Sequence, residues 1–360
     1  MKASAYFAQS YAEARQKFIA AATAAGHEPV PHPHPLLGRD GEMLAMDVVR
    51  FGAADAPALL LITSGCHGVE GFCGSGVQNA LLADGGLHAA AARAGVALLY
   101  IHALNPYGFS WLRRTTHENV DLNRNFQDFS QPLPHNAAYD RLAHLIVPAE
   151  WPPTPEVKAG LAGFSDEHGA KALQTAMSSG QYEHPQGLFY GGRNPTWSQQ
   201  TLRHVLQEQG RRCQRLAWVD LHTGLGPSGH GERIWAGPDD AGALERARRW
   251  WGKEVTSMYD GSSTSAVLTG LMWLAAGQEC AQAEYTGIAL EYGTLPVEQV
   301  MYALRADQWL ENHPDAPQAL RLQIKRLVRD AFYTDTEAWK SKVIEQGVEV
   351  AHQAVAGLAA

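Results

Sequence analysis

The sequence contains few cysteines and no paired cysteine motif. Its 360 residues include four, at Cys66, Cys73, Cys213 and Cys280. None belongs to a C-x-x-C pair, so neither a zinc knuckle built from thiolates nor a redox-active dithiol is expected. Four scattered cysteines in a chain of this length are typical of buried thiols in a reducing compartment.

Long apolar runs are also missing. No stretch reaches the ~18 apolar residues that a membrane-spanning helix requires. Near the N-terminus, Glu13, Arg15, Gln16 and Lys17 interrupt the apolar segment that a signal peptide needs. We therefore expect residues 8–25 to form a helix, the protein to be cytoplasmic, and the membrane not to be a partner.

Basic residues are in the minority. The formal net charge is -8, from 29 Lys and Arg against 37 Asp and Glu. A nucleic-acid-binding protein needs a basic face, and anionic membranes attract basic segments, so neither partner is expected. With 45% hydrophobic residues the composition is that of a globular protein, and α/β folds of this length can form one unit. We expect residues 1–360 to form a single domain.

Four short apolar runs predict buried strands, at residues 58–65, 96–101, 216–221 and 287–291. Helices are expected near residues 69–82, 137–147, 196–209, 240–254, 297–311, 316–332 and 336–356. Strands that alternate with helices favour an α/β sandwich around a largely buried central sheet.

Two segments depart from this alternation. Residues 29–35 (PVPHPHP) alternate proline and histidine, which predicts a proline-stiffened surface loop, although histidine is also a metal-binding residue type. Residues 148–195 are rich in proline and glycine and predict an insertion into the domain. Long structured insertions in enzymes often act as lids or binding loops.

The first chemical signal is SGCHGVE at residues 64–70. His67 follows a predicted buried strand, and Glu70 lies three residues later, near the start of a predicted helix. This spacing lets an imidazole and a carboxylate approach one metal ion. H-x-x-E is a weak motif by itself, because a chain with 16 histidines can match it by chance. The alternative is a loop histidine and a glutamate that suits a helix N-terminus, where the dipole favours a carboxylate.

A second histidine follows another predicted strand, in VDLHTG at residues 219–224. Ligands of open α/β sheets bind outside the carboxyl ends of the strands, so His222 and His67 are expected to meet there. Two histidines and a glutamate form a catalytic zinc set with an open fourth position. Asp220 is either a partner of a metal-bound histidine or a strand-end carboxylate in a salt bridge.

Arginines and a further glutamate supply other candidates. Arg113, Arg114 and Arg124 lie within twelve residues of a chain that is acidic overall. They form either a solvated basic loop or a set of cations for a substrate carboxylate, which the arginine fork binds through both oxygens. Glu291 ends the apolar run at 287–291, where a partly desolvated carboxylate suits a general base.

In this order, the segments resemble the zinc metallocarboxypeptidases and their deacylase relatives. The matching motifs are H-x-x-E at 67–70, N-P-x-G at 105–108, DLNRNF at 121–126, the strand end at His222, and Glu291. DLNRNF after an N-P-x-G turn is the most specific of them. The segments DLHTGLG and EYGT are more similar to an uncharacterised bacterial branch near succinylglutamate desuccinylase and aspartoacylase.

The resemblance implies a fold and a metal. The fold is a three-layer α/β sandwich with a central mixed sheet flanked by helices. The implied cofactor is one Zn²⁺ ion, with His67, Glu70 and His222 as its ligands. Asn123 and Arg124 match the pair that binds the carboxylate of the substrate.

The resemblance also implies catalytic roles. Arg114 is the best match for the arginine that stabilises the oxyanion, and Arg113 is the alternative, with a role in substrate binding. Glu291 matches the general base. A family tyrosine has no clear match, and the candidates are Tyr259, Tyr285 and Tyr292.

The implied activity is zinc-dependent hydrolysis of an amide bond in a peptide or small molecule that carries a free carboxylate. Carboxypeptidase action is the first hypothesis and deacylation of N-acyl amino acids the second, which a tight lid from residues 148–195 would favour. A non-catalytic binding protein on the same fold is a further alternative, and an oligomer is compatible with the sequence. A cysteine hydrolase using Cys66 and His67 is disfavoured because adjacent side chains at a strand end point apart.

Overall fold

A mixed sheet of seven strands forms the centre of the molecule. The computed structural model describes residues 2–360. The strands lie in the order β1-β2-β4-β3-β5-β7-β6. Their bounds are β1 Val30–Leu37, β2 Met43–Phe51, β3 Ala58–Ser64, β4 Val96–His102, β5 Arg215–Thr223, β6 Gly231–Trp235 and β7 Glu284–Tyr292. The central β4, β3, β5 and β7 are parallel to one another, whereas β1, β2 and β6 pair antiparallel.

Helices connect and cover these strands. The α-helices are α1 Tyr11–Ala24, α2 Gly71–Leu82, α3 Gly85–Ala94, α4 Pro106–Ser110, α5 Ala137–Ile146, α6 Pro155–His168, α7 Ala170–Ser178, α8 Trp197–Gln209, α9 Ala241–Trp251, α10 Leu274–Glu279, α11 Val297–Asn312, α12 Gln318–Phe332 and α13 Glu337–Ala359. Within residues 2–360 there are also three short 3-10 helices, η1 Ala3–Tyr6, η2 Gly68–Glu70 and η3 Leu122–Arg124. No helix within residues 2–360 is long and apolar enough to cross a membrane.

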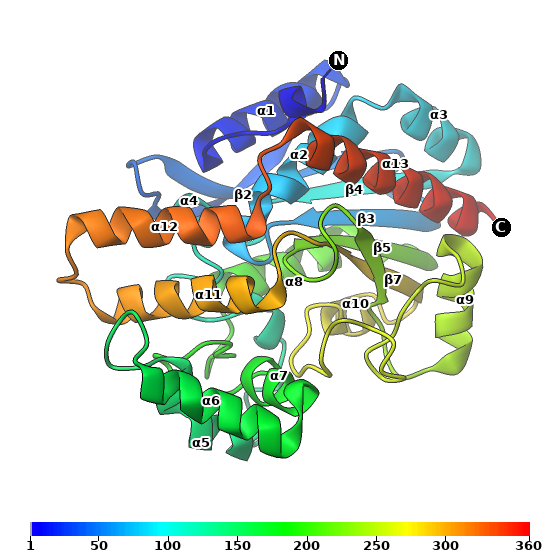
Figure 1. Ribbon diagram of the computed structural model, residues 1–360. Helices are drawn as coiled ribbons and strands as arrows, with labels where there is room; N and C mark the ends of the chain where they lie inside the picture. Colours follow the sequence, from blue (N-terminus) through cyan, green and yellow to red (C-terminus); the bar gives the residue numbers. More distant parts are fainter. Residues whose placement is uncertain (1) are drawn as a thin grey trace.

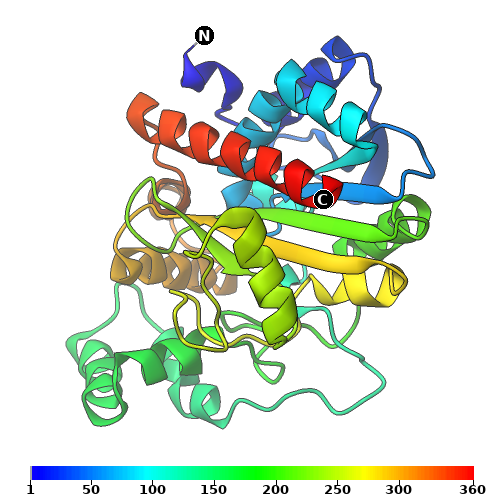
Figure 2. The same cartoon turned by 90° about the vertical axis from the view of Figure 1, so that its right-hand side faces the viewer.

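The sheet has helices on both faces. In β3, Leu60 and Ile62 belong to the core beneath α1, α2 and α13, whereas Leu59 and Leu61 belong to the core beneath α8 and α10. This alternation follows from the two-residue period of a strand, and it explains why β3 reads as a continuous apolar run. Figure 1 shows α13 running across one face of the sheet. Figure 2 shows the same layers after a turn of 90°. The predicted three-layer α/β sandwich is confirmed.

The prediction for residues 29–35 was wrong. They form most of β1, which pairs antiparallel with β2 in the register Val30 to Val48 and His32 to Met46. Proline cannot donate a hydrogen bond to a neighbouring strand, so strands that contain it lie at sheet edges. β1 is the outermost strand on its side of the sheet, which is why it accommodates three prolines.

Residues 148–195 contain α6 and α7, which pack on each other and on α5. In Figure 1 these helices lie apart from the sheet, beyond the pair formed by α11 and α12. The helical character of this segment was not predicted, because the proline and glycine content of the whole segment suggested loops. Most of these prolines and glycines lie outside the two helices. Its role as a lid stays a prediction.

Candidate metal centre

Parallel strands carry three of the candidate residues to one edge of the sheet. His67 follows β3, while His222 and Glu291 lie near the ends of β5 and β7. β5 and β7 pair in parallel with His222 opposite Glu291. Residues that are far apart in the sequence therefore meet at the carboxyl edge of the sheet.

A tight backbone corner presents His67 and Glu70 to this edge. The corner is η2, and it lies against α4. A Cβ atom at Gly68 would lie 2.1 Å from the carbonyl carbon of Gly108, so only glycine fits there. The Gly68 N–H donates a hydrogen bond to the carbonyl oxygen of Arg114 at 3.1 Å. The loop that carries the arginines is thereby fixed beside the corner.

The three predicted ligands converge. Nδ1 of His67 lies 2.9 Å from Oε1 of Glu70 and 3.3 Å from Nδ1 of His222. Nδ1 of His222 lies 3.1 Å from Oε2 of Glu70. All three side chains are buried, and their candidate ligand atoms lie within 4.8 Å of one another. Two imidazole nitrogens and a carboxylate at these separations can bind a single cation.

A carboxylate lies beside the outer nitrogen of His222. Nε2 of this histidine is 2.5 Å from Oδ2 of Asp220. The other oxygen of Asp220 accepts a hydrogen bond from the hydroxyl of Thr63 at 2.6 Å, and Trp218 donates to the same hydroxyl at 2.8 Å. Such a carboxylate keeps the proton on the outer nitrogen and leaves Nδ1 free to bind a metal.

Asp121 also lies beside a histidine ligand, at the outer nitrogen of His67, but there a terminal nitrogen of Arg114 lies closer, at 2.8 Å from the same Nε2. Oδ1 of Asp121 lies 3.2 Å from Nε2 of His67, and its Oδ2 accepts a hydrogen bond from Nε of Arg114 at 2.9 Å. Arg114 also donates to Oε1 of Glu70 at 3.3 Å. Burial would raise the pKa of Asp121, but Arg114 and Arg124 hold it well below its usual range. Asp121 was not singled out in the sequence, although it begins the DLNRNF motif.

The charged groups of the site shift one another's pKa values. Burial would raise the pKa of Glu70, but His67 and His222 hold it below its usual range. Burial would lower the pKa of His222, but Asp220 and Glu70 raise it well above its usual value. Burial and then the Glu70 carboxylate raise the pKa of Glu291 to about 8. Several perturbed groups in one cleft are typical of a functional site.

Arg113 does not reach this site. Its guanidinium lies 3.5 Å from Glu311 and 3.9 Å from Asp307, both on α11, and it donates to Asn119 at 2.9 Å. Acidic side chains of α11 attract Arg113 away from the cleft, whereas the next residue, Arg114, faces the candidate ligands. The expectation that Arg113 binds substrate is therefore corrected.

A cavity of about 950 Å³ opens onto the candidate residues, with Arg114, Asn123, Arg124 and Glu291 in its wall. Nε and one terminal nitrogen of Arg124 donate to the carbonyl oxygen of Ser178 at 3.1 and 2.6 Å. The other terminal nitrogen donates to the carbonyl oxygen of Asn123 at 2.8 Å. These hydrogen bonds hold the buried guanidinium at the cavity wall.

The three candidate tyrosines lie in different surroundings. Tyr259 donates its hydroxyl hydrogen bond to the carbonyl oxygen of Gly237 at 3.0 Å, and Tyr292 donates to that of Val343 at 3.0 Å. Tyr285 is in the cavity wall. Among the three, Tyr285 is the one in the cavity wall, but it lies near the start of β7, about 20 Å along the strand from Glu291.

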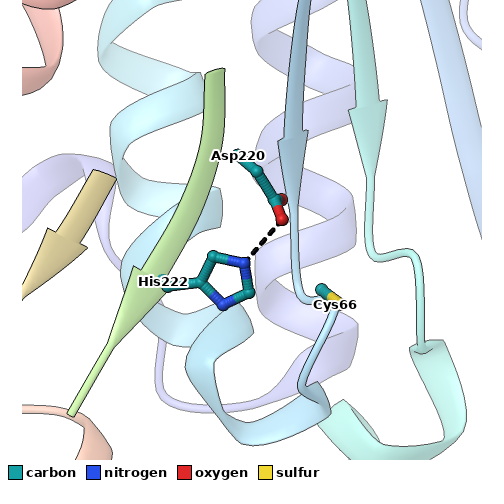
Figure 3. Close-up of side chains that lie close together, drawn as sticks. All are labelled: Cys66, Asp220 and His222. Carbon is teal, nitrogen blue, oxygen red and sulfur yellow. Dashed lines mark hydrogen bonds and ion pairs between the residues drawn. The ribbon is translucent and has the colours of Figure 1, made fainter. Parts of the chain in front are cut away.

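A second group of metal-binding residue types overlaps the first. Candidate ligand atoms of Cys66, Asp220 and His222 lie within 4.8 Å of one another. Figure 3 shows Asp220 and His222 turned toward each other on β5, with Cys66 beyond the end of β3. Burial and then Asp220 raise the pKa of the Cys66 thiol well above its usual value. A thiol kept neutral is a poor nucleophile and a poor metal ligand, which argues against both this group and a cysteine hydrolase.

The four cysteines are free and buried, as the sequence suggested. Burial raises the pKa of each thiol, at Cys280 to about 12. This environment matches structural thiols that fill the core.

The chain is similar in fold to several solved structures. Carboxypeptidase A from Helicoverpa armigera is 14% identical with a TM-score of 0.44, covering 90% of this chain and 74% of that one. Thrombin activatable fibrinolysis inhibitor is 13% identical with a TM-score of 0.47, covering 85% and 76%. A metallo-carboxypeptidase from Burkholderia cenocepacia is 12% identical with a TM-score of 0.46, covering 98% and 70%.

Two comparisons concern the sequence. A search of curated proteins found no match. The model of one protein family matches residues 7–346, almost the whole chain. This chain therefore belongs to the family described as "Protein of unknown function (DUF2817)".

Proposed function

We propose that this protein is a zinc-dependent hydrolase that cleaves an amide bond in a substrate with a free carboxylate. One observation carries the proposal. The ligand atoms of His67, Glu70 and His222 converge within 4.8 Å, and a carboxylate lies beside the outer nitrogen of each histidine. Paired carboxylates of this kind are typical of histidines that bind zinc.

The residues present fit a zinc ion. Ligand atoms at tetrahedral positions around zinc, about 2.0–2.1 Å from it, are separated by about 3.3 Å. The corresponding separations among His67, Glu70 and His222 are 2.9, 3.1 and 3.3 Å. Two histidines and a glutamate leave one position open, as in catalytic zinc sites. A bound zinc ion supplies Lewis-acid chemistry, which polarises a carbonyl group and makes water more acidic.

Glu291 is the proposed general base. It lies opposite His222 in the sheet, and its Oε1 accepts a hydrogen bond from the N–H of Leu225 at 2.9 Å. This hydrogen bond holds the carboxylate in the cleft and leaves Oε2 free to accept a proton from the attacking water. A carboxyl group whose pKa is raised by burial can both accept and return a proton near neutral pH.

Arg114, Asn123 and Arg124 are the proposed substrate contacts. Arg114 is fixed by Asp121 and Glu70 at the edge of the cavity, where its charge supports a developing oxyanion. Asn123 and Arg124 lie in the same wall and would orient a substrate carboxylate, which places the amide for attack.

The overall reaction adds water across an amide bond. The carbon–nitrogen bond breaks, and the water oxygen joins the carbonyl carbon. Glu291 takes one proton from the water and delivers it to the leaving nitrogen. The products are a carboxylic acid and an amine.

The substrate of this reaction is either a peptide, as for a carboxypeptidase, or an N-acyl amino acid. One observation favours the second candidate. Side chains of α6 and α7, from the insertion at residues 148–195, form part of the cavity wall. A peptide needs an open groove, whereas helices over the cavity suit a substrate that is enclosed when bound.

The test combines metal analysis with two substrate panels. We expect one zinc ion per chain, loss of activity on chelation, and recovery when zinc is returned. His222→Ala should lose both zinc and activity, while the matched change at the exposed His230 should keep both. Faster hydrolysis of N-acyl amino acids than of C-terminal peptide bonds would support the second candidate. A chain that binds no stoichiometric zinc and hydrolyses neither panel would instead be a non-catalytic binding protein.

A further inference from the structure

Helix α11 turns one apolar stripe toward the cavity. Val297, Val300, Met301 and Leu304 all border it. Their spacing of three, four and seven residues places them on one face of the helix. α11 starts soon after β7 ends, so this stripe begins beside the strand that carries Glu291.

Helices α6 and α7 supply the facing side. Leu173 and Met177 on α7, and Leu161 on α6, border the same cavity. The lysines that border it, Lys158 and Lys171, lie nearer the start of each helix and are exposed. Charge is therefore at the rim and apolar surface is inside. Figure 1 shows α6 and α7 on the side of α11 that lies away from the sheet.

We define the acyl chamber as the part of the cavity bordered by Leu161, Leu173, Met177, Val300, Met301 and Leu304. The apolar stripe of a helix is normally buried against another element, because exposure to water is unfavourable. Here Met177, Val300 and Leu304 are buried in the hydrophobic core, and together with Leu161, Leu173 and Met301 they also border a shared space. The whole cavity, at about 950 Å³, has room for a drug-sized molecule. A short acyl group such as acetyl would leave the chamber unfilled.

Polar anchors lie at the mouth of the acyl chamber. Arg124 binds the carbonyl oxygen of Ser178, the residue that follows Met177 on α7. A carboxylate at Arg124 would therefore lie next to one end of the apolar wall. The opposite wall, α11, follows Glu291 in the chain. The chamber thus begins beside the proposed carboxylate site and belongs to the same cavity as the proposed base.

We propose that the acyl chamber holds a long aliphatic acyl chain, so that the substrate class is long-chain N-acyl amino acids. This inference rests on the proposed amide hydrolysis and narrows it. The carboxylate of the amino acid binds at Asn123 and Arg124, the amide lies at the metal centre, and the chain lies between α7 and α11. Hydrolysis releases a fatty acid and a free amino acid.

The test measures kcat/KM for N-acyl alanines with acyl chains from two to fourteen carbons. Each methylene buried in an apolar site contributes about 0.8 kcal/mol, which is about fourfold. We expect kcat/KM to rise by about three- to fourfold per methylene until the chamber is full. The inference would be overturned if kcat/KM of the active enzyme did not change with chain length. It would also be overturned if short-chain substrates with a bulky apolar C-terminal residue were cleaved as fast as the long-chain N-acyl alanines.

Variants test the two walls separately. Leu173→Trp on α7 and Met301→Trp on α11 each fill part of the chamber, so each should move the best chain length to a shorter value. Leu322→Trp is the matched control, because Leu322 is 59% exposed on α12. Retained zinc and an unchanged melting temperature would show that a variant is folded. Wild-type chain-length profiles in both wall variants would overturn the inference.

A binding measurement separates this inference from the proposed function. Calorimetry of N-dodecanoyl-alanine and N-acetyl-alanine with Glu291→Gln reports on the chamber without turnover. Tighter binding of the dodecanoyl compound, weakened in the double variant with Leu173→Trp, supports the chamber even if no amide is hydrolysed. Equal or undetectable binding of the two compounds would overturn it. Failure of hydrolysis alone would count against the proposed function.

Discussion

Each histidine of the candidate centre has two distinct environments. Its Nδ1 faces the other ligands, and its Nε2 faces a carboxylate, Asp220 for His222 and Asp121 for His67, where a nitrogen of Arg114 lies at 2.8 Å as well. A cation at the two Nδ1 atoms would require each ring to carry its one proton on Nε2, where the carboxylate accepts it. The two Nδ1 atoms would then present their lone pairs to the same cation, and at His67 the Arg114 nitrogen would have to move away from Nε2.

This arrangement predicts that the outer carboxylates support metal binding. Asp220→Asn and Asp121→Asn should each lower zinc affinity by about 10- to 100-fold, as for other partners of zinc-bound histidines. Competition with a chromophoric chelator measures the affinity. Asp128→Asn, at an exposed position, is the control and should bind zinc as the wild type does. Unchanged affinity in both test variants would contradict the role given to these carboxylates.

Glu291 allows a prediction that separates binding from catalysis. Glu291→Gln keeps the shape of the side chain but removes its ability to accept a proton. We expect kcat to fall by about 10²- to 10⁴-fold, while the zinc content stays the same. Glu284→Gln on the same strand is the control, because the Glu284 side chain is 54% exposed and surface ion pairs such as its pair with Arg246 contribute little. Full activity of Glu291→Gln would exclude it as the base.

Residue-level prediction succeeded where a strand end determined the position. His67, His222 and Glu291 could be brought together from the sequence because parallel strands share a carboxyl edge. Arg113 and Arg114 could not be told apart, because they are adjacent on a loop and their directions depend on α11. Asp121 was missed for a similar reason: its contact with His67 crosses between two loops.

At the scale of the element, the corner η2 sets the distance between His67 and Glu70. The close approach of Gly68 to Gly108 leaves no room for a side chain. Gly68→Ala should therefore move the corner, lower the unfolding free energy by about 1–3 kcal/mol, and reduce activity by about 10²-fold through misplaced ligands. Thermal unfolding and turnover measure the two effects.

A matched glycine gives the control for this prediction. Gly163 lies inside α6, and an added Cβ would have nothing within 4 Å. Gly163→Ala should raise stability by about 0.5–1 kcal/mol, because alanine favours the helix more than glycine does. If Gly68→Ala behaved like Gly163→Ala, the corner would not depend on the close backbone approach.

Elements were predictable when their residues were buried on both sides. The continuous apolar runs of β3, β4, β5 and β7 stood out in the sequence, and all four strands are present. β2 and β6 were missed because the first contains Asp47 and Arg50 and the second begins with Gly231, Glu232 and Arg233. Their polar residues are satisfied by partners outside the strand, such as Arg15 for Asp47 at 2.7 Å. Such partners are known only once the fold is known.

At the scale of the whole molecule, the buried core makes stability depend on pH. His102 ends β4, is fully buried, and stacks on Phe18 with ring centroids 4.6 Å apart. Its Nε2 is 3.0 Å from the hydroxyl oxygen of Ser75. Burial lowers the pKa of His102 to about 4. The folded protein therefore binds the proton of His102 less readily than the unfolded chain, in which the pKa is about 6.5.

The sign of the effect follows from proton linkage. Below pH 6.5 His102 is protonated in the unfolded chain, but in the folded protein it is protonated only below about pH 4. The free energy of unfolding therefore falls as pH drops through this window. A shift from about 6.5 to about 4 corresponds to about 3 kcal/mol in total, of which about 2 kcal/mol falls between pH 7 and pH 5.

Urea unfolding of the wild type at these two pH values, compared with His102→Gln, should reveal this difference as a shallower pH dependence in the variant. The exposed His230, changed to Gln, should leave the dependence as in the wild type. Identical pH dependence in all three proteins would mean that the pKa of His102 is the same in the folded and the unfolded protein. That result would contradict the effect expected from the burial of His102 in the three-layer fold.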